Sequence, residues 1–256
     1  MAKIIGVLNQ KGGTGKTTTA VNLAGYLAAS GKYTLLVDLD PQGNATSGLG
    51  FEPAELSGGL YEVLSGQKKP EEVIKRTQLF GFELLPSTSD LAGAGVELVN
   101  VPEREFVLKN ALGRVRTNYD YILVDCPPSL SLLTINGLLS ADELLIPVQA
   151  EYYALEGLGQ LFKTVNLINQ SVPAPIKIKG ALLTMYDRRN KLARQVGKEI
   201  QQYFPGYVFE AVIPRCVKLA EAPSHGKIIL QYFPKSKGAR AYRDLAQEII
   251  KLDAVN

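Results

Sequence analysis

Short apolar runs and amphipathic stretches alternate along almost the whole chain. The apolar runs lack the alternation of half-exposed strands and end at Gly, Pro or charged residues, as is typical of parallel strands covered on both faces. The stretches between them carry apolar residues at helical spacing. The predicted strands are 4–8, 34–37, 82–85, 121–124, 144–148, 178–183 and 207–213. The predicted helices are 16–29, 104–116, 130–139, 155–169, 191–203 and 240–252.

This alternation predicts an α/β fold with a single doubly wound, mostly parallel sheet that is flanked by helices. Residues 43–77 are richer in glycine and weakly periodic, with short helical pieces expected at 60–64 and 70–76. We find no internal repeat, low-complexity tract or linker. We therefore expect residues 1–256 to form one domain.

Composition narrows the class of protein. The chain is 46% apolar, and its two cysteines, Cys126 and Cys216, exclude a disulfide framework and a four-cysteine zinc site within one chain. The apolar start of the chain turns polar at Asn9, which is too early for a signal peptide. No run approaches the ~20 apolar residues that span a bilayer. We expect a soluble, cytoplasmic protein.

Charge is divided unevenly between the two parts of the chain. Residues 1–170 hold 13 Lys and Arg against 18 Asp and Glu, whereas residues 171–256 hold 15 against 7. A basic second part favours a surface that binds a polyanion, although scattered solvated lysines would give the same balance.

A glycine-rich segment at residues 9–19, Asn-Gln-Lys-Gly-Gly-Thr-Gly-Lys-Thr-Thr-Thr, joins the first predicted strand to the first predicted helix. Such a turn surrounds an anion with backbone N–H groups and a helix N-terminus. Lys16 would reach the β- and γ-phosphates of a nucleotide, and the Thr17 hydroxyl would bind Mg²⁺. The predicted nucleotide-binding residues of the loop are Lys11, Gly12, Gly13, Thr14, Gly15, Lys16, Thr17 and Thr18.

The loop departs from the general phosphate-loop spacing, because the first glycine of that pattern falls on Gln10 and a lysine follows at position 11. In this respect it resembles the deviant Walker A motif. The resemblance implies that Lys11 crosses a dimer interface and contacts the phosphates held by the other subunit. That is the task of an arginine finger supplied in trans.

Two further predicted strands end in carboxylates. Asp38 and Asp40 follow the strand at 34–37, and Asp125 follows the strand at 121–124 in a Walker B pattern. Ligands of parallel sheets lie beyond the carboxyl ends of the strands, where all three carboxylates are expected. Asp125 would hold Mg²⁺ through water, and Asp40 would orient or deprotonate the attacking water. We expect Asp38 to lie next to the groups that bind the metal, without binding the ion itself.

Together these motifs resemble the ParA/Soj-type partition ATPases, and the likeness extends over nearly the whole chain. It includes Asp-Pro-Gln-Gly-Asn-Ala-Thr at 40–46, Asp-Cys-Pro-Pro-Ser at 125–129, Glu-Tyr-Tyr-Ala-Leu-Glu-Gly-Leu at 151–158 and the block at 213–227. The resemblance implies a cycle with ATP and Mg²⁺. An ATP-dependent homodimer binds double-stranded DNA without sequence preference, and a ParB-like adaptor protein then stimulates hydrolysis.

The resemblance also implies roles for particular residues. Lys11, Lys16 and Asp40 would act in catalysis, while Pro214 and Cys216 would contact the adenine. The DNA-contacting residues of the family match two basic segments of this chain. We expect Arg189 and Lys218 to bind DNA, with Arg188 and Arg215 as neighbours. The ATP-bound form would associate with the nucleoid.

Three other readings stay open on the sequence. A related ATPase that positions another cargo, such as a carboxysome, would keep the same ATP and DNA chemistry. A MinD-like membrane-cycling ATPase would need a basic amphipathic helix at the carboxyl terminus, and acidic residues dilute the basic face of 240–252. An iron–sulfur carrier of the nitrogenase-reductase kind would need two exposed cysteines near a dimer axis.

Overall fold

The computed structural model describes residues 1–151, 154–172 and 174–255, so Tyr152 and Tyr153 of the motif at 151–158 lie outside the described residues. Within these ranges, seven strands form one sheet in the order β3-β4-β2-β5-β1-β6-β7. The strands are β1 (Lys3–Val7), β2 (Thr34–Asp38), β3 (Lys75–Arg76), β4 (Phe82–Leu85), β5 (Tyr121–Asp125), β6 (Glu143–Gln149) and β7 (Lys177–Thr184).

The sheet is parallel except for β3, the short edge strand that pairs antiparallel with β4. A hydrophobic core lies on each face of the sheet, and side chains of adjacent residues in a strand pack into opposite cores. Ile122 and Val124 pack on one face, while Leu123 between them packs on the other. Burial on both faces explains why the strands read as continuous apolar runs. The predicted fold class is confirmed.

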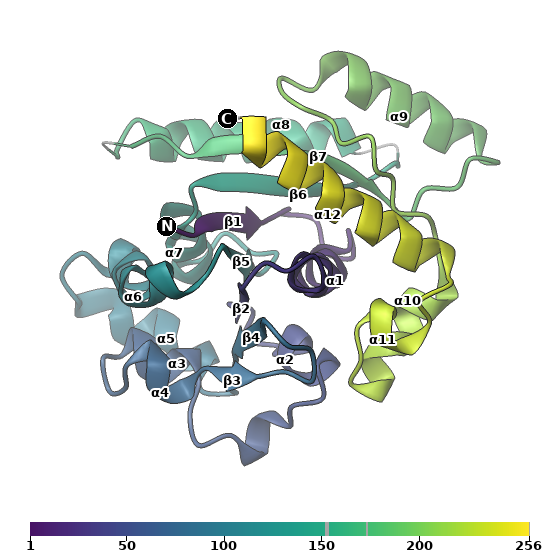
Figure 1. The fold of residues 1–256 in the computed structure, drawn as a ribbon. Coiled ribbons are helices and arrows are strands. Elements are labelled where there is room, and N and C mark those ends of the chain that lie inside the picture. Colours follow the sequence, from purple (N-terminus) through teal and green to yellow (C-terminus); the bar gives the residue numbers. More distant parts are fainter. Residues whose placement is uncertain (152–153, 173, 256) are drawn as a thin grey trace.

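Helices cover both faces of the sheet (Figure 1). α1, α10, α11 and α12 lie on one side, and α3 to α7 lie on the other. The helices of seven or more residues are α1 (Lys16–Ala29), α5 (Leu91–Glu97), α6 (Val107–Val115), α7 (Leu132–Ser140), α8 (Ala154–Asn169), α9 (Lys191–Tyr203) and α12 (Lys237–Val255). The shorter ones are α2 (Asn44–Gly48), α3 (Leu60–Leu64), α4 (Pro70–Val73), α10 (Val217–Glu221) and α11 (Ile229–Tyr232).

Capping side chains fix where two of the predicted helices begin. The Ser131 hydroxyl accepts a hydrogen bond from the Thr134 N–H at the start of α7. The Asn190 side chain accepts from the Leu192 and Ala193 N–H groups, so α9 begins at Lys191 as predicted. Such caps satisfy N–H groups that have no partner within the helix.

The segment 207–213 was predicted to be a strand, and that prediction was wrong. It runs beside β7 but forms only isolated bridges, with Val208 opposite Ala181 and Pro214 opposite Tyr186. The carboxylate of Glu248 on α12 explains the interruption, because it accepts hydrogen bonds from the Glu210 N–H (2.7 Å) and the Ala211 N–H (3.0 Å). The Glu248 side chain thus binds main-chain N–H groups that would otherwise be available to a neighbouring strand.

A second difference concerns residues 70–76, which were predicted as one helical piece. Pro70–Val73 is helical, but Lys75–Arg76 forms β3. The short helices α2, α5, α10 and α11 were not predicted. They contain four to seven residues, too few to show a clear apolar period.

Candidate functional site

The loop between β1 and α1 has a backbone that only glycine adopts easily. Gly13 and Gly15 have φ angles of 73° and 85°, in the left-handed region. A Cβ atom on Gly12 or Gly13 would meet nothing within 4 Å, so packing against protein does not require glycine there. The open space lies at the N-terminus of α1, whose first turn holds no acidic residue. An anion is favoured in this position.

The two lysines of the loop have different environments. Lys16 is buried, its Nζ donates to the carbonyl oxygen of Lys11 at 3.1 Å, and burial lowers the pKa of its ammonium group despite the nearby carboxylates. Lys11 is exposed and forms an ion pair with Glu151, at 2.6 Å between Nζ and Oε2. Lys16 therefore lies inside the phosphate loop, and Lys11 lies at its rim.

Three carboxylates lie at the ends of neighbouring strands. The register pairs Asp125 with Val7 at the end of β1 and with Asp38 at the end of β2. Both carboxylate oxygens of Asp125 are buried and have no hydrogen-bond partner among the described residues. Burial, and then the Asp38 carboxylate, raises the pKa of Asp125 well above its usual range, while Thr17 and Lys16 oppose this shift. A buried carboxyl group without a partner beside the Thr17 hydroxyl suits a hydrated Mg²⁺ ion.

Asp38 and Asp40 differ in how the protein uses them. Asp38 is fully buried and accepts hydrogen bonds from the N–H (2.8 Å) and the hydroxyl (2.7 Å) of Thr46. Burial raises the pKa of Asp38 to about 6, although these hydrogen bonds act in the opposite direction. Asp40 is half-buried, and its side chain accepts from the Gln42 N–H at 3.0 Å. Asp40 thus lies nearer to solvent than Asp38 does.

Beside the loop lies a pocket of about 370 Å³ with a mainly apolar lining. Pro214 and Cys216, the residues expected to contact an adenine, line it together with Gly15 and Thr18 of the phosphate loop. Sequence reasoning missed Tyr242, which also lines the pocket and whose hydroxyl lies 3.2 Å from that of Thr19. The only signal was an apolar period in the last helix.

The two basic segments expected to contact DNA lie next to each other. The Tyr186 N–H donates to the carbonyl oxygen of Ile213 at 3.0 Å, which joins residues 187–189 to the loop at 213–218. Arg188, Arg189 and Arg215 are exposed, and Arg189 forms a two-pronged contact with Asp187. Lys218 is partly covered. It pairs with Glu221 at 2.7 Å and lies about 6 Å from the ring centres of Tyr232 and Phe233.

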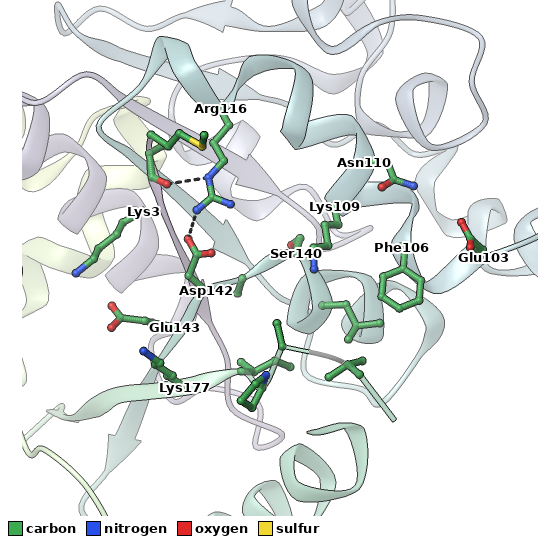
Figure 2. A pocket seen from close by; sticks show the side chains of 18 of the residues that line it. Lys3, Glu103, Phe106, Lys109, Asn110, Arg116, Ser140, Asp142, Glu143 and Lys177 are labelled. Atoms are coloured by element: carbon green, nitrogen blue, oxygen red, sulfur yellow. Dashed lines mark hydrogen bonds and ion pairs between the residues drawn. The ribbon is translucent and has the colours of Figure 1, made fainter. Parts of the chain in front are cut away.

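A larger pocket, of about 1140 Å³, opens at the opposite, amino-terminal edge of the sheet (Figure 2). Its charged side chains largely neutralise one another. Arg116 pairs with Asp142, and Lys3 pairs with Asp253, both at 2.5 Å. Since it lacks a glycine loop and an anion cradle, this pocket is not the nucleotide site despite its size.

Comparisons with known proteins agree with this geometry. A family model described as an AAA domain matches residues 2–178. The chain is 53% identical to the sporulation initiation inhibitor protein Soj of Bacillus subtilis, over 97% of this chain and 98% of that protein. It is 51% identical to the chromosome partitioning protein ParA of Myxococcus xanthus, over 99% and 89%.

A solved structure adds the ligands. Cobyrinic acid a,c-diamide synthase from Mycobacterium smegmatis, with a bound ATP analogue and magnesium, has a TM-score of 0.87 and 37% identity over 99% of this chain and 96% of that one. Fold, site and comparisons define a P-loop ATPase that binds ATP with Mg²⁺. Within that class, the chain belongs to the Soj/ParA family of chromosome-partitioning ATPases.

Proposed function

We propose that residues 1–256 act as one ATPase domain whose ATP-bound homodimer binds DNA without sequence preference and drives chromosome or plasmid partition. A ParB-like adaptor would stimulate hydrolysis and so release the protein from the nucleoid. One observation carries the proposal. Arg215 lies between Pro214 and Cys216, so the basic surface and the base pocket share one loop. A nucleotide in the pocket therefore touches the same segment that would touch DNA.

The position of Lys11 supports a dimer in which each subunit completes the other's site. Its ammonium group lies outside its own phosphate loop, in an ion pair with Glu151 in which both side chains are nearly half exposed. An ion pair that open to solvent contributes only ~0–1 kcal/mol. Lys11 is therefore free to exchange Glu151 for the phosphates of a nucleotide in a second subunit, as the family resemblance implies.

The basic residues are accessible for contacts to the phosphates of a DNA backbone. Arg189 is 91% exposed at its side chain, and Arg188 and Arg215 are also exposed on the joined segments. Lys218 offers a point charge without the fork that reads a base edge. Binding to the DNA backbone alone needs several such contacts, and a dimer doubles those of one subunit.

The other readings fit the structure less well. In α12 the apolar residues Tyr242, Leu245 and Ile249 are buried against the sheet, so the apolar face that a MinD-like membrane helix needs is covered. No helix among the described residues is long and apolar enough to cross a membrane. Cys126 is buried and Cys216 lines the base pocket, which disfavours a shared iron–sulfur cluster. Transport of another cargo would use the same chemistry.

The test is a DNA-binding titration with ATP, ADP or no nucleotide on two unrelated duplexes. We expect binding only with ATP, equal affinity for both duplexes and a steep loss of affinity with added salt. Arg189→Glu or Lys218→Glu should weaken binding to both duplexes while ATP affinity is unchanged. Each should reduce the salt slope by about 2, because the dimer carries two copies of a contact worth ~1.

Arg76→Glu is the matched control. Arg76 is 92% exposed at its side chain and lies on β3, at the opposite edge of the sheet from β7. Its reversal changes net charge by the same amount and should leave DNA binding unchanged. Equal binding in all nucleotide states, or strong preference for one duplex, would contradict the proposal.

A further inference from the structure

The segment that follows β4 reaches into the loop that carries Asp40. Ser87 is fully buried, and its hydroxyl donates to the main-chain carbonyl of Asp40 at 2.9 Å. The Ser87 N–H donates in turn to the hydroxyl oxygen of Thr46 at 2.9 Å. Ser87 therefore contacts Asp40 in the loop and Thr46 in the helix α2 that follows the loop.

Thr46 closes the connection to β2. Its hydroxyl accepts from the Ser87 N–H and donates to the Asp38 carboxylate at 2.7 Å, while its own N–H donates to the same carboxylate oxygen at 2.8 Å. Thr46, Ser87 and Asp38 are all fully buried. Loss of the Thr46 hydroxyl would leave the buried Ser87 N–H without its hydrogen-bond acceptor.

We infer that Thr46 and Ser87 are positioning residues for ATP hydrolysis, acting by fixing the main chain at Asp40 so that its carboxylate faces the attacking water. The inference rests on the catalytic role proposed for Asp40. Asp40 is only half-buried, and the hydrogen bond that its side chain accepts comes from within its own turn, at Gln42. The rest of its orientation depends on the backbone. The Asp40 carbonyl also accepts from the Gly43 N–H within the turn, and Ser87 adds the contact from the segment after β4.

We expect these hydrogen bonds of Ser87 and Thr46 to affect the rate of hydrolysis more than the affinity for ATP. The phosphate loop and the base pocket use other segments, so ATP affinity does not depend on Ser87. Thr46 also donates to Asp38, which is expected to support the metal site, so Ser87 gives the cleaner test. Water orientation is sensitive to small displacements, since a shift of about 1 Å can cost roughly 100-fold in rate. A residue with a purely structural role would instead alter stability and leave the rate of the folded fraction unchanged.

The experiment measures single-turnover hydrolysis and ATP-analogue affinity for Ser87→Ala and for Thr46→Val, which removes the hydroxyl at similar size. We expect hydrolysis to fall roughly 10- to 100-fold in both variants, with the affinity of Ser87→Ala within about twofold of wild type. Thr46→Ser restores the hydroxyl and should recover most of the rate. If Thr46→Val does not fold, Ser87→Ala still tests the inference, because it removes only the contact to Asp40.

Two controls make the outcome specific. Ser140→Ala deletes another buried hydroxyl that donates to a carbonyl at 2.9 Å, in α7 and at the far edge of the sheet, and should hydrolyse ATP at the wild-type rate. Ser87→Ala should add no further loss to Asp40→Ala, because both act through one group. Normal hydrolysis in Ser87→Ala and Thr46→Val overturns the inference. Normal hydrolysis in Asp40→Ala overturns the catalytic role of Asp40 itself.

Discussion

Buried charges are paired differently at the two ends of the strands, called here the amino-terminal edge and the carboxyl edge of the sheet. At the amino-terminal edge, Lys179 is only 4% exposed at its side chain and pairs with Glu143 (2.6 Å) and Asp253 (2.7 Å). Asp253 also pairs with Lys3 and accepts from the Tyr121 hydroxyl at 2.9 Å. Although burial acts against it, the hydrogen bonds from Lys179 and Lys3 hold the pKa of Asp253 below its usual value. Here the chain neutralises its own charges.

At the carboxyl edge, the chain leaves its charges for ligands. Asp125 has no hydrogen-bond partner among the described residues, and its pKa is raised by burial and by the Asp38 carboxylate. Lys16 is buried against a loop carbonyl, with its pKa lowered by burial. Burial of these charges costs free energy, and in the proposed site each group would gain a partner from ATP or Mg²⁺. Stability and function are thus assigned to opposite edges of one sheet.

The largest effect on nucleotide binding is expected from Lys16→Ala, at the carboxyl ends of the strands. It removes the buried cation for the phosphates, and loss of such a contact costs ~2–5 kcal/mol. ATP affinity should fall roughly 100-fold or more, as measured by titration with a fluorescent ATP analogue. Thermal stability without nucleotide should stay the same or rise. Lys109→Ala, at the pocket of the other edge, is the control, and unchanged affinity in Lys16→Ala would contradict the assignment.

Asp253→Ala tests the amino-terminal edge and should have the reverse profile. It leaves Lys179 buried with only one of its two carboxylates, and breaking a buried ion pair costs ~3–5 kcal/mol. Urea unfolding should show this loss of stability, while ATP affinity stays at the wild-type value. Since the pKa of Asp253 is lowered in the folded state, its contribution is present at neutral pH and is lost as pH falls through that value. A normal midpoint would show that the cluster is not stabilising.

The strands and the polar residues at their ends could largely be predicted from local sequence. The order in which the strands pair in the sheet could not. Buried strands and the polar residues directly after them gave the parallel strands, the phosphate loop and the three carboxylates. Ser87 has the same sequence feature, because it is a polar residue that follows the predicted strand at 82–85. Its role was missed because it depends on β4 lying next to β2, an order that the chain sequence does not state.

Contacts between distant parts of the chain were the least predictable. The pairs Lys11–Glu151 and Lys179–Asp253 join residues 140 and 74 positions apart, and no spacing rule relates them. Glu248 lies on a correctly predicted helix, yet it interrupts a strand that local propensity favours at 207–213. In each case tertiary packing, rather than local pattern, decides the partner.

Asp38→Asn should change how stability depends on pH, with the smallest effect of the three substitutions. Burial raises the pKa of Asp38 from 3.8 to about 6, so between these values the folded protein keeps a proton that the unfolded chain has lost. Stability without nucleotide therefore falls as pH rises through this window, by up to about 3 kcal/mol at ~1.4 kcal/mol per pKa unit. Asparagine does not titrate and still accepts from Thr46, so the variant should lose the part of this decline that Asp38 contributes. The part from Asp125, whose pKa is also raised, should remain. Urea midpoints between about pH 4 and pH 6 measure it, and parallel curves for the two proteins would contradict the account.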